Sequence, residues 1–194
     1  MCAANVKIES EEILSDDWYL LKKTTFKREQ SNGQSQTVTR ETYDRGNGAT
    51  ILLYNLQHGT VVLTKQFRYP TYVNGNVSGD LIETAAGLLD SVDPATRIRR
   101  EAEEETGFSV NHVTPVFEAY MSPGSVTERL YFFIAEYEES DRTSKGGGIQ
   151  DEGEDIEVLE IDFSQAMSMI DSGEICDGKT IMLLQYAALN LFTD

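Results

Sequence analysis

Cysteine and histidine are scarce in this chain of 194 residues, which has two of each. The two cysteines, Cys2 and Cys176, are far apart in the sequence. They provide neither a disulfide framework nor the paired spacing of a zinc site. We therefore expect the protein to work in a reducing compartment.

Long apolar runs are also lacking. The first residues, MCAANVKIESEEILSDD, are acidic and contain no apolar signal segment. No uninterrupted run approaches the roughly 20 apolar residues that a membrane-spanning helix needs. We therefore expect a cytoplasmic protein with no membrane partner.

Basic residues are few. The chain has 16 Lys and Arg residues against 33 Asp and Glu residues, and its formal net charge is −17. This charge repels nucleic-acid backbones, so we expect no nucleic-acid partner. It also repels a small anionic substrate unless multivalent cations occupy the site. The alternative is that the acidity serves only solubility.

The residues that are present predict a mixed α/β (α+β) fold. With 40% hydrophobic residues, the chain can bury one core and carry a small appended unit. Within residues 1–45, two β-prone segments flank a polar turn and predict a small antiparallel unit. The expected later strands are ATILLYN, TVVLTKQFRYP, DLIETAAGLL, VTPVFEAYMS, RLYFFIAEYE and IEVLEIDF, and the expected C-terminal helices are FSQAMSMIDSG and KTIMLLQYAALNLF.

The segment DPATRIRREAEEETGF, residues 93–108, predicts a short helix. Asp93 can cap the free N–H groups, and proline is tolerated at the first helical position. Gly107 supplies the end. The 3.6-residue period places Ala95, Ile98 and Ala102 on one stripe, which we expect to face the core.

Several glutamates of this helix are predicted to face the protein rather than water. Glu105 falls within the apolar stripe, Glu101 lies at its edge, and Glu104 lies a little further round. Burial of unpaired carboxylates is costly, so a cation should neutralise them, and hard oxygen ligands favour Mg²⁺ or Mn²⁺. A solvated salt-bridged face would explain Arg99 and Glu103 but not Glu105.

The segment AGLLDSVDPATRIRREAEEETGF resembles the signature box of the Nudix hydrolases. Gly87 matches the first glycine of that pattern, and residues 100–108 match its second half in full. Asp93 stands where glutamate is usual in the family pattern, and the number of residues between Asp93 and Arg100 is one fewer than in that pattern. The flanking segments YDRGNGATILLYN, VNGN, YMSPG, FFIAEY, GGG, EDIEVLE and DGKT resemble the nucleotide-sugar branch of that family.

The resemblance implies a Nudix fold, in which a mixed β-sheet is sandwiched between helices. It implies an N-terminal dimerisation unit at residues 1–45 and a hydrolase domain at residues 46–194. The expected activity is Mg²⁺-dependent hydrolysis of GDP-mannose to GMP and mannose 1-phosphate, with Mn²⁺ as a substitute metal. The alternatives are an ADP-ribose or other ADP-sugar pyrophosphatase, a non-catalytic nucleotide-sugar sensor and, least supported, a structural calcium-binding module.

The resemblance also implies roles for individual residues. The expected metal ligands are Glu101, Glu105, Glu154 and the backbone carbonyl of Ala86. The expected catalytic residues are Glu104, Glu105 and Glu152, and either Glu152 or Glu154, on the glycine-rich loop expected to be flexible, is the general base. In a homodimer, the N-terminal unit would complete the partner's site. The expected substrate-binding residues are Trp18, Thr39, Arg40, Glu41, Arg68, Ala86, Gly87, Leu88, Glu105, Glu128, Gly153, Glu154 and Lys179.

Overall fold

A computed structural model describes residues 5–149, 151 and 153–193 of the chain. The chain divides into two compact units, which are considered separately. Unit 1 comprises Met1–Asn47 and Tyr120–Arg129, and unit 2 comprises Gly48–Ala119 and Leu130–Asp194. None of the helices in the described parts of the chain has the length and apolar character needed to span a bilayer.

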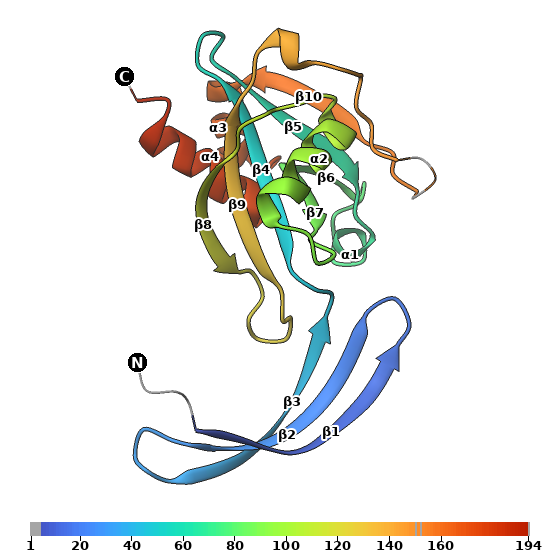
Figure 1. The fold of residues 1–194 in the computed structure, drawn as a ribbon, viewed down its shortest axis with the longest axis vertical. Helices are drawn as coiled ribbons and strands as arrows, with labels where there is room; N and C mark the ends of the chain where they lie inside the picture. The colour runs from blue at the N-terminus through green and yellow to red at the C-terminus, as the bar shows by residue number, and fades with distance from the viewer. Residues whose placement is uncertain (1–4, 150, 152, 194) are drawn as a thin grey trace. The chain divides into compact units, whose positions relative to one another are not determined.

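Unit 1 contains an antiparallel three-stranded sheet in the order β1-β2-β3 (Figure 1). The sequence predicts β2 and β3 but not β1. Acidic residues are unfavourable in strands, and the pairing of β1 with β2 shifts register after Ile8 and again after Ile13. These shifts break the alternation that identifies a strand. The bounds are β1 (Val6–Asp16), β2 (Leu20–Glu29) and β3 (Ser35–Asp44).

Unit 2 is built on a seven-stranded mixed sheet. Its main path runs β10-β5-β4-β9-β8, with β6 paired to β5 and β7 paired to β4. The β4–β9 pair is parallel, whereas β4 pairs antiparallel with β5 and β7. The bounds are β4 (Gly48–Asn55), β5 (Thr60–Phe67), β6 (Asp80–Glu83), β7 (Ala85–Leu88), β8 (Thr114–Tyr120), β9 (Arg129–Glu136) and β10 (Glu157–Asp162).

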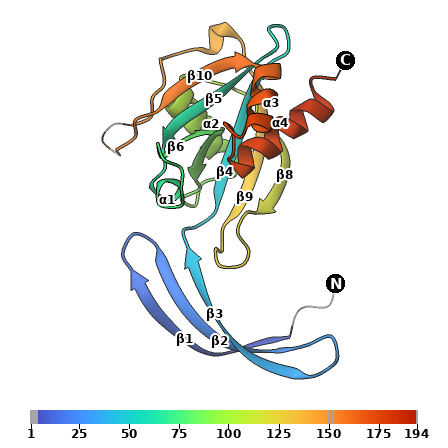
Figure 2. The ribbon, with the colours of Figure 1, turned by 180° about the vertical axis from the view of Figure 1, so that it is seen from behind.

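Helices cover both faces of this sheet. One face carries α2, which contacts β4, β5 and β7, and the opposite face carries α3 and α4 (Figures 1 and 2). Buried side chains from β4, β5, β9 and α2 form a core between α2 and the sheet. The predicted mixed sheet between helices is confirmed. The helices are α1 (Tyr69–Tyr72), α2 (Pro94–Thr106), α3 (Phe163–Ser172) and α4 (Gly178–Asn190), and a short 3₁₀ turn is η1 (Glu139–Asp141).

The segment DLIETAAGLL forms two strands rather than the single predicted strand. The first strand, β6, pairs with β5 up to Glu83, and the second strand, β7, pairs with β4 from Ala85 onward. Between them, the N–H of Thr84 donates to Oγ1 of Thr180 at 2.7 Å instead of to a neighbouring strand. The prediction was wrong because a side chain of α4, distant in sequence, takes over a strand hydrogen bond.

Candidate functional site

The two ends of α2 are the predicted ones. Oδ2 of Asp93 accepts a hydrogen bond from the N–H of Thr96 at 3.0 Å. Gly107 adopts the left-handed conformation with φ 81°, and its N–H donates to the carbonyl of Glu103. Because both ends are defined, the face that the helix turns toward the sheet is defined as well.

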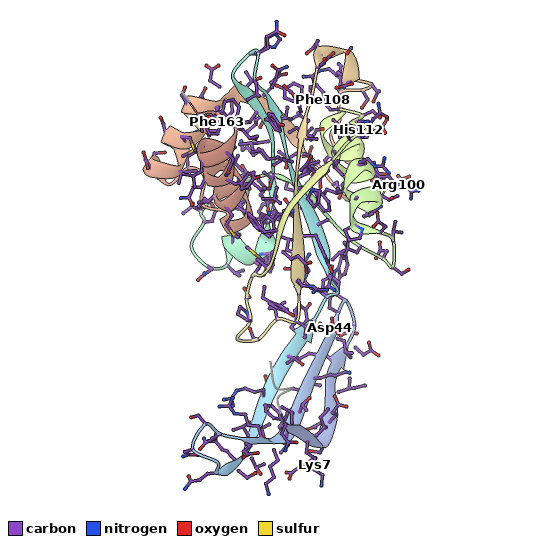
Figure 3. The ribbon with its side chains drawn as sticks, turned by 60° about the vertical axis from the view of Figure 1, so that its left-hand side comes forward. Lys7, Asp44, Arg100, Phe108, His112 and Phe163 are labelled. Carbon is purple, nitrogen blue, oxygen red and sulfur yellow. The ribbon has the colours of Figure 1, made fainter. Side chains whose placement is uncertain are left out.

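The glutamates of α2 divide between the interior and the solvent. Glu101 is 6% exposed and Glu105 is 3% exposed, in line with the buried apolar stripe. Glu103 is exposed, and Arg100 lies on the outer side of the helix (Figure 3). The prediction that glutamates of this helix face the protein body is therefore confirmed for Glu101 and Glu105, whereas Glu104 is only partly buried.

Glu105 is buried beside other carboxylates, which makes its negative charge unfavourable. Burial, first of all, and then the carboxylates of Glu101 and Glu154 raise its pKa to about 8. The charge of Arg68 and a hydrogen bond from the N–H of Ala86 to Oε2, at 3.3 Å, oppose this increase without cancelling it. A cation at this position would take the place of the proton that Glu105 otherwise holds.

Glu101 is held against β7. Oε1 of Glu101 is 2.5 Å from Nη2 of Arg97, and Nε of the same arginine donates to the carbonyl of Leu88 at 3.0 Å. A Cβ built on Gly87 would stand 1.9 Å from Oε1 of Glu101. Only glycine permits this approach, so the glycine that opens the signature segment is required for the contact between β7 and α2.

The three consecutive glycines 146–148 bind the C-terminal turn of α2. All three have positive φ, and the N–H groups of Gly147 and Gly148 donate to the carbonyls of Glu105 and Glu104 at 2.9 and 3.1 Å. A Cβ on Gly146 would stand 2.4 Å from the carbonyl oxygen of Glu105. Where the sequence suggests a flexible patch, the structure therefore shows a tight backbone attachment that satisfies free helix carbonyls.

Glu154 is attached to the same loop. Its Oε2 accepts a hydrogen bond from the N–H of Ile149 at 2.8 Å. A Cβ on Gly148 would stand 2.5 Å from that oxygen. The loop thus places Glu154 close enough for its charge to act on Glu105. Glu152, the other predicted general base, lies outside the described residues.

Two predicted substrate-binding cations share one buried carboxylate. Nε of Arg68 is 2.6 Å from Oε2 of Glu83, and Nζ of Lys179 bonds to Oε1 of the same residue. Lys179 also pairs with Asp177 at 3.0 Å. Glu83 is not predicted from the sequence, although a charged residue in the apolar run DLIETAAG was a detectable signal.

Five of the predicted substrate-binding residues belong to unit 1, whereas Gly153 and the carboxylates above belong to unit 2. Trp18 follows β1 and is 81% exposed. Residues 39–41 are exposed on β3. Glu128 pairs with Arg45 at 3.5 Å. The predicted site residues of unit 1 are Trp18, Thr39, Arg40, Glu41 and Glu128.

The donor set of unit 2 suits a hard divalent cation. Within residues 5–149, 151 and 153–193, no three Asp, Glu, His or Cys side chains form a ready-made metal cluster. Burial and the neighbouring carboxylates of Glu101 and Glu154 nevertheless raise the pKa of Glu105, and a divalent ion would favour its charged form. The oxygen donors predicted from the sequence are the carboxylates of Glu101, Glu105 and Glu154 and the carbonyl of Ala86.

Two family models match the chain. The model of the GDP-mannose pyrophosphatase NudK N-terminal domain matches residues 5–43, and that of the NUDIX domain matches residues 44–182. A solved structure described as an ADP compounds hydrolase has a TM-score of 0.69 and 17% identity, and the match covers 92% of this chain and 90% of that one. At this identity the likeness shows a common fold.

Curated relatives align along nearly the full length. A GDP-mannose pyrophosphatase of Pectobacterium atrosepticum is 58% identical over 95% of this chain and 94% of its own length. One of Escherichia coli strain UTI89 is 54% identical over 97% and 98%, and one of Yersinia pestis is 56% identical over 97% and 95%. The resemblance seen in the sequence is confirmed: this chain belongs to the NUDIX family of hydrolases.

Proposed function

We propose that the protein hydrolyses the diphosphate linkage of GDP-mannose and releases GMP and mannose 1-phosphate. The observation that supports this most strongly is the high identity, over nearly the whole chain, to relatives named GDP-mannose pyrophosphatase. The match includes a domain named for that enzyme at residues 5–43. The acidic cluster of α2 is intact, as a hydrolase requires and a nucleotide-sugar sensor does not.

Hydrolases of this family use divalent metal ions, and Mg²⁺ is the ion we propose here, with Mn²⁺ as a substitute. Glu101, Glu105 and the carbonyl of Ala86 would hold it, together with Glu154 from the loop. When bound, such ions neutralise phosphate charge and make a bound water more acidic. The choice of Mg²⁺ is supported by the oxygen atoms that these residues offer as ligands and by the burial of the Glu105 carboxylate.

The chain's own residues position the reactants. Phosphoryl transfer depends mainly on alignment and charge neutralisation, so rigid ligands are an advantage. The attachment of glycines 146–148 to α2 supports a role in holding Glu154 and Glu105 in one arrangement. Glu104, partly buried on the same turn, would orient water around the ligands. Either Glu152 or Glu154 would accept a proton from the attacking water.

Arg68 and Lys179 are proposed to donate to the phosphate or sugar. The charge of Arg68 acts on Glu105, which supports its placement beside the carboxylates. Gly87 and Leu88 of β7, and Gly153 of the loop, would contribute backbone contacts.

We also propose that the protein is a homodimer in which unit 1 completes the partner's site. No residue of 5–47 or 120–129 is buried in the single chain, although β1–β3 carry exposed apolar side chains. An open three-stranded sheet gains stability when a second surface covers it. Light scattering should give a mass near twice the chain's 21.7 kDa. A monomeric mass would contradict this proposal.

Product analysis tests the substrate. The purified protein is incubated with Mg²⁺ and, separately, with GDP-mannose, ADP-ribose or ADP-glucose, with a chelator control. GMP and mannose 1-phosphate should dominate. AMP from the adenine substrates would instead indicate an ADP-sugar pyrophosphatase, and the absence of any metal-dependent product would favour the sensor.

A further inference from the structure

Glu83 is a buried charge at the edge of the candidate site. It ends β6, and only 3% of its surface is exposed. Burial of a lone carboxylate is costly, so its two oxygens need cationic partners. They have them: Oε2 pairs with Arg68 and Oε1 with Lys179. The carboxylate of Glu83 therefore links Arg68, which follows β5, to Lys179, which lies in α4.

The backbone around Glu83 is held from two sides. Its carbonyl accepts a hydrogen bond from Oγ1 of Thr64 at 3.3 Å, and the N–H of the next residue, Thr84, donates to Oγ1 of Thr180. Oγ1 of Thr180 in turn donates to Asp177, which caps α4. The backbone at Glu83 is thus held in place, and its carboxylate can restrain the longer side chains of Arg68 and Lys179.

The pairing leaves Arg68 able to act on a ligand. Its bond to Glu83 uses Nε, so Nη1 and Nη2 take no part in it, and 39% of the side chain is exposed. Lys179 differs, because only 12% of its side chain is exposed and Asp177 is a second partner. Arginine presents its donors as a rigid fork, so fixing Nε also fixes the direction of the other two nitrogens.

We propose that Glu83 is a positioning residue that holds the side chains of Arg68 and Lys179 together and directs them toward the diphosphate of the substrate. This inference rests on the proposed function. Glu83 touches no reacting atom in this scheme and acts through the two cations. Loss of its charge should weaken substrate binding more than it slows the chemical step.

The first test is the variant Glu83→Gln. An amide replaces one oxygen by an NH₂ group, so one of the two cations meets a donor instead of an acceptor. KM for GDP-mannose should rise at least about tenfold, with a smaller change in kcat, as for other residues that orient a ligand-binding group. Glu83→Asp keeps the charge and should recover part of the loss. Glu160→Gln is the matched control, because Glu160 also accepts from an arginine and a second donor, Arg142 and Tyr137.

The second test separates positioning from a purely structural role. In an Arg68→Ala/Lys179→Ala background, Glu83→Gln should change KM no further, because the groups through which it acts are gone. A further loss of the same size as in the wild-type background would overturn the inference. So would a Glu83→Gln variant with unchanged KM in an active enzyme, which would leave the proposed function standing.

Binding of GDP in the presence of Mg²⁺, measured by calorimetry, provides a readout that does not need turnover. Glu83→Gln should weaken it by a factor similar to the rise in KM, and Glu83→Asp by less. Should the wild-type protein bind GDP but hydrolyse no GDP-mannose, the proposed function fails while the binding comparison still tests Glu83. A wild-type protein that binds no diphosphate would overturn the role of Glu83 as well. Thermal unfolding identifies any variant that does not fold.

Discussion

Gly87 lies so close to the carboxylate of Glu101 that no Cβ fits between them. The glycine lies on β7 and the glutamate on α2, and a Cβ on the glycine would stand 1.9 Å from Oε1 of the glutamate. The strand residue before the glycine, Ala86, donates its N–H to Glu105. The closeness of strand and helix therefore brings the backbone of β7 against the carboxylates of α2.

Replacing Gly87 by alanine should weaken metal binding. The added Cβ would displace the Glu101 carboxylate, and changing a residue that positions a metal ligand typically costs about 10- to 100-fold in metal affinity or activity. Titration of the activity with Mg²⁺ measures the effect. Gly124→Ala is the control, because a Cβ there meets nothing within 4 Å. Equal Mg²⁺ dependence of the two variants would contradict the proposed ligand role of Glu101.

The variant Glu105→Gln should lose most of its activity and keep its fold. The amide has nearly the same shape but cannot supply the negative charge that a divalent ion needs, and we expect kcat to fall by at least about a hundredfold. Glu103→Gln is the comparison, because Glu103 lies on the same helix but is exposed. Steady-state rates with GDP-mannose and circular dichroism of both variants suffice. Unchanged turnover in Glu105→Gln would exclude the mechanism.

The contribution of Glu105 to the stability of the metal-free protein should fall as the pH rises from about 4.5 to about 8. The pKa of Glu105 is about 8 in the folded protein and 4.5 ordinarily, so the folded state binds more protons than the unfolded state within this range. This contribution to stability is complete below pH 4.5 and is lost as the pH passes the folded pKa. Denaturant unfolding in EDTA at several pH values measures it for wild type and Glu105→Gln. The free-energy difference between the two should change with pH across this range, and parallel curves would disprove the assignment.

Gly148→Ala should impair activity more than stability alone explains. Gly148 and Gly173 have similar positive φ values, 75° and 82°, so alanine costs comparable backbone strain at both, about 1 kcal/mol. Only at Gly148 would the Cβ meet the carboxylate of Glu154, at 2.5 Å. Urea unfolding and kcat are measured for both alanine variants. Equal loss of activity in the two would show that the loop glycines act through stability and not through Glu154.

The part of the site on α2 could be predicted because its causes are local. Asp93 and Gly107 define the helix ends, and the 3.6-residue period then determines that Glu105 is buried while Glu103 is exposed. The role of glycines 146–148 could not be predicted in this way. A glycine run in sequence is compatible with a mobile loop and with close packing, and only contact with the carbonyls of α2 distinguishes them.

By itself, the sequence determined the mixed α/β class, the limits of α2 and the carboxylates that α2 turns toward the sheet, because capping and helical periodicity depend on neighbours within a few residues. The tertiary structure alone decided the strand β1, the break at Thr84 and the pairing of Glu83 with Arg68 and Lys179. Strand register and shared ion pairs join residues far apart in the chain. Their energies therefore depend on distances that exist only once the sheet and α4 have packed together.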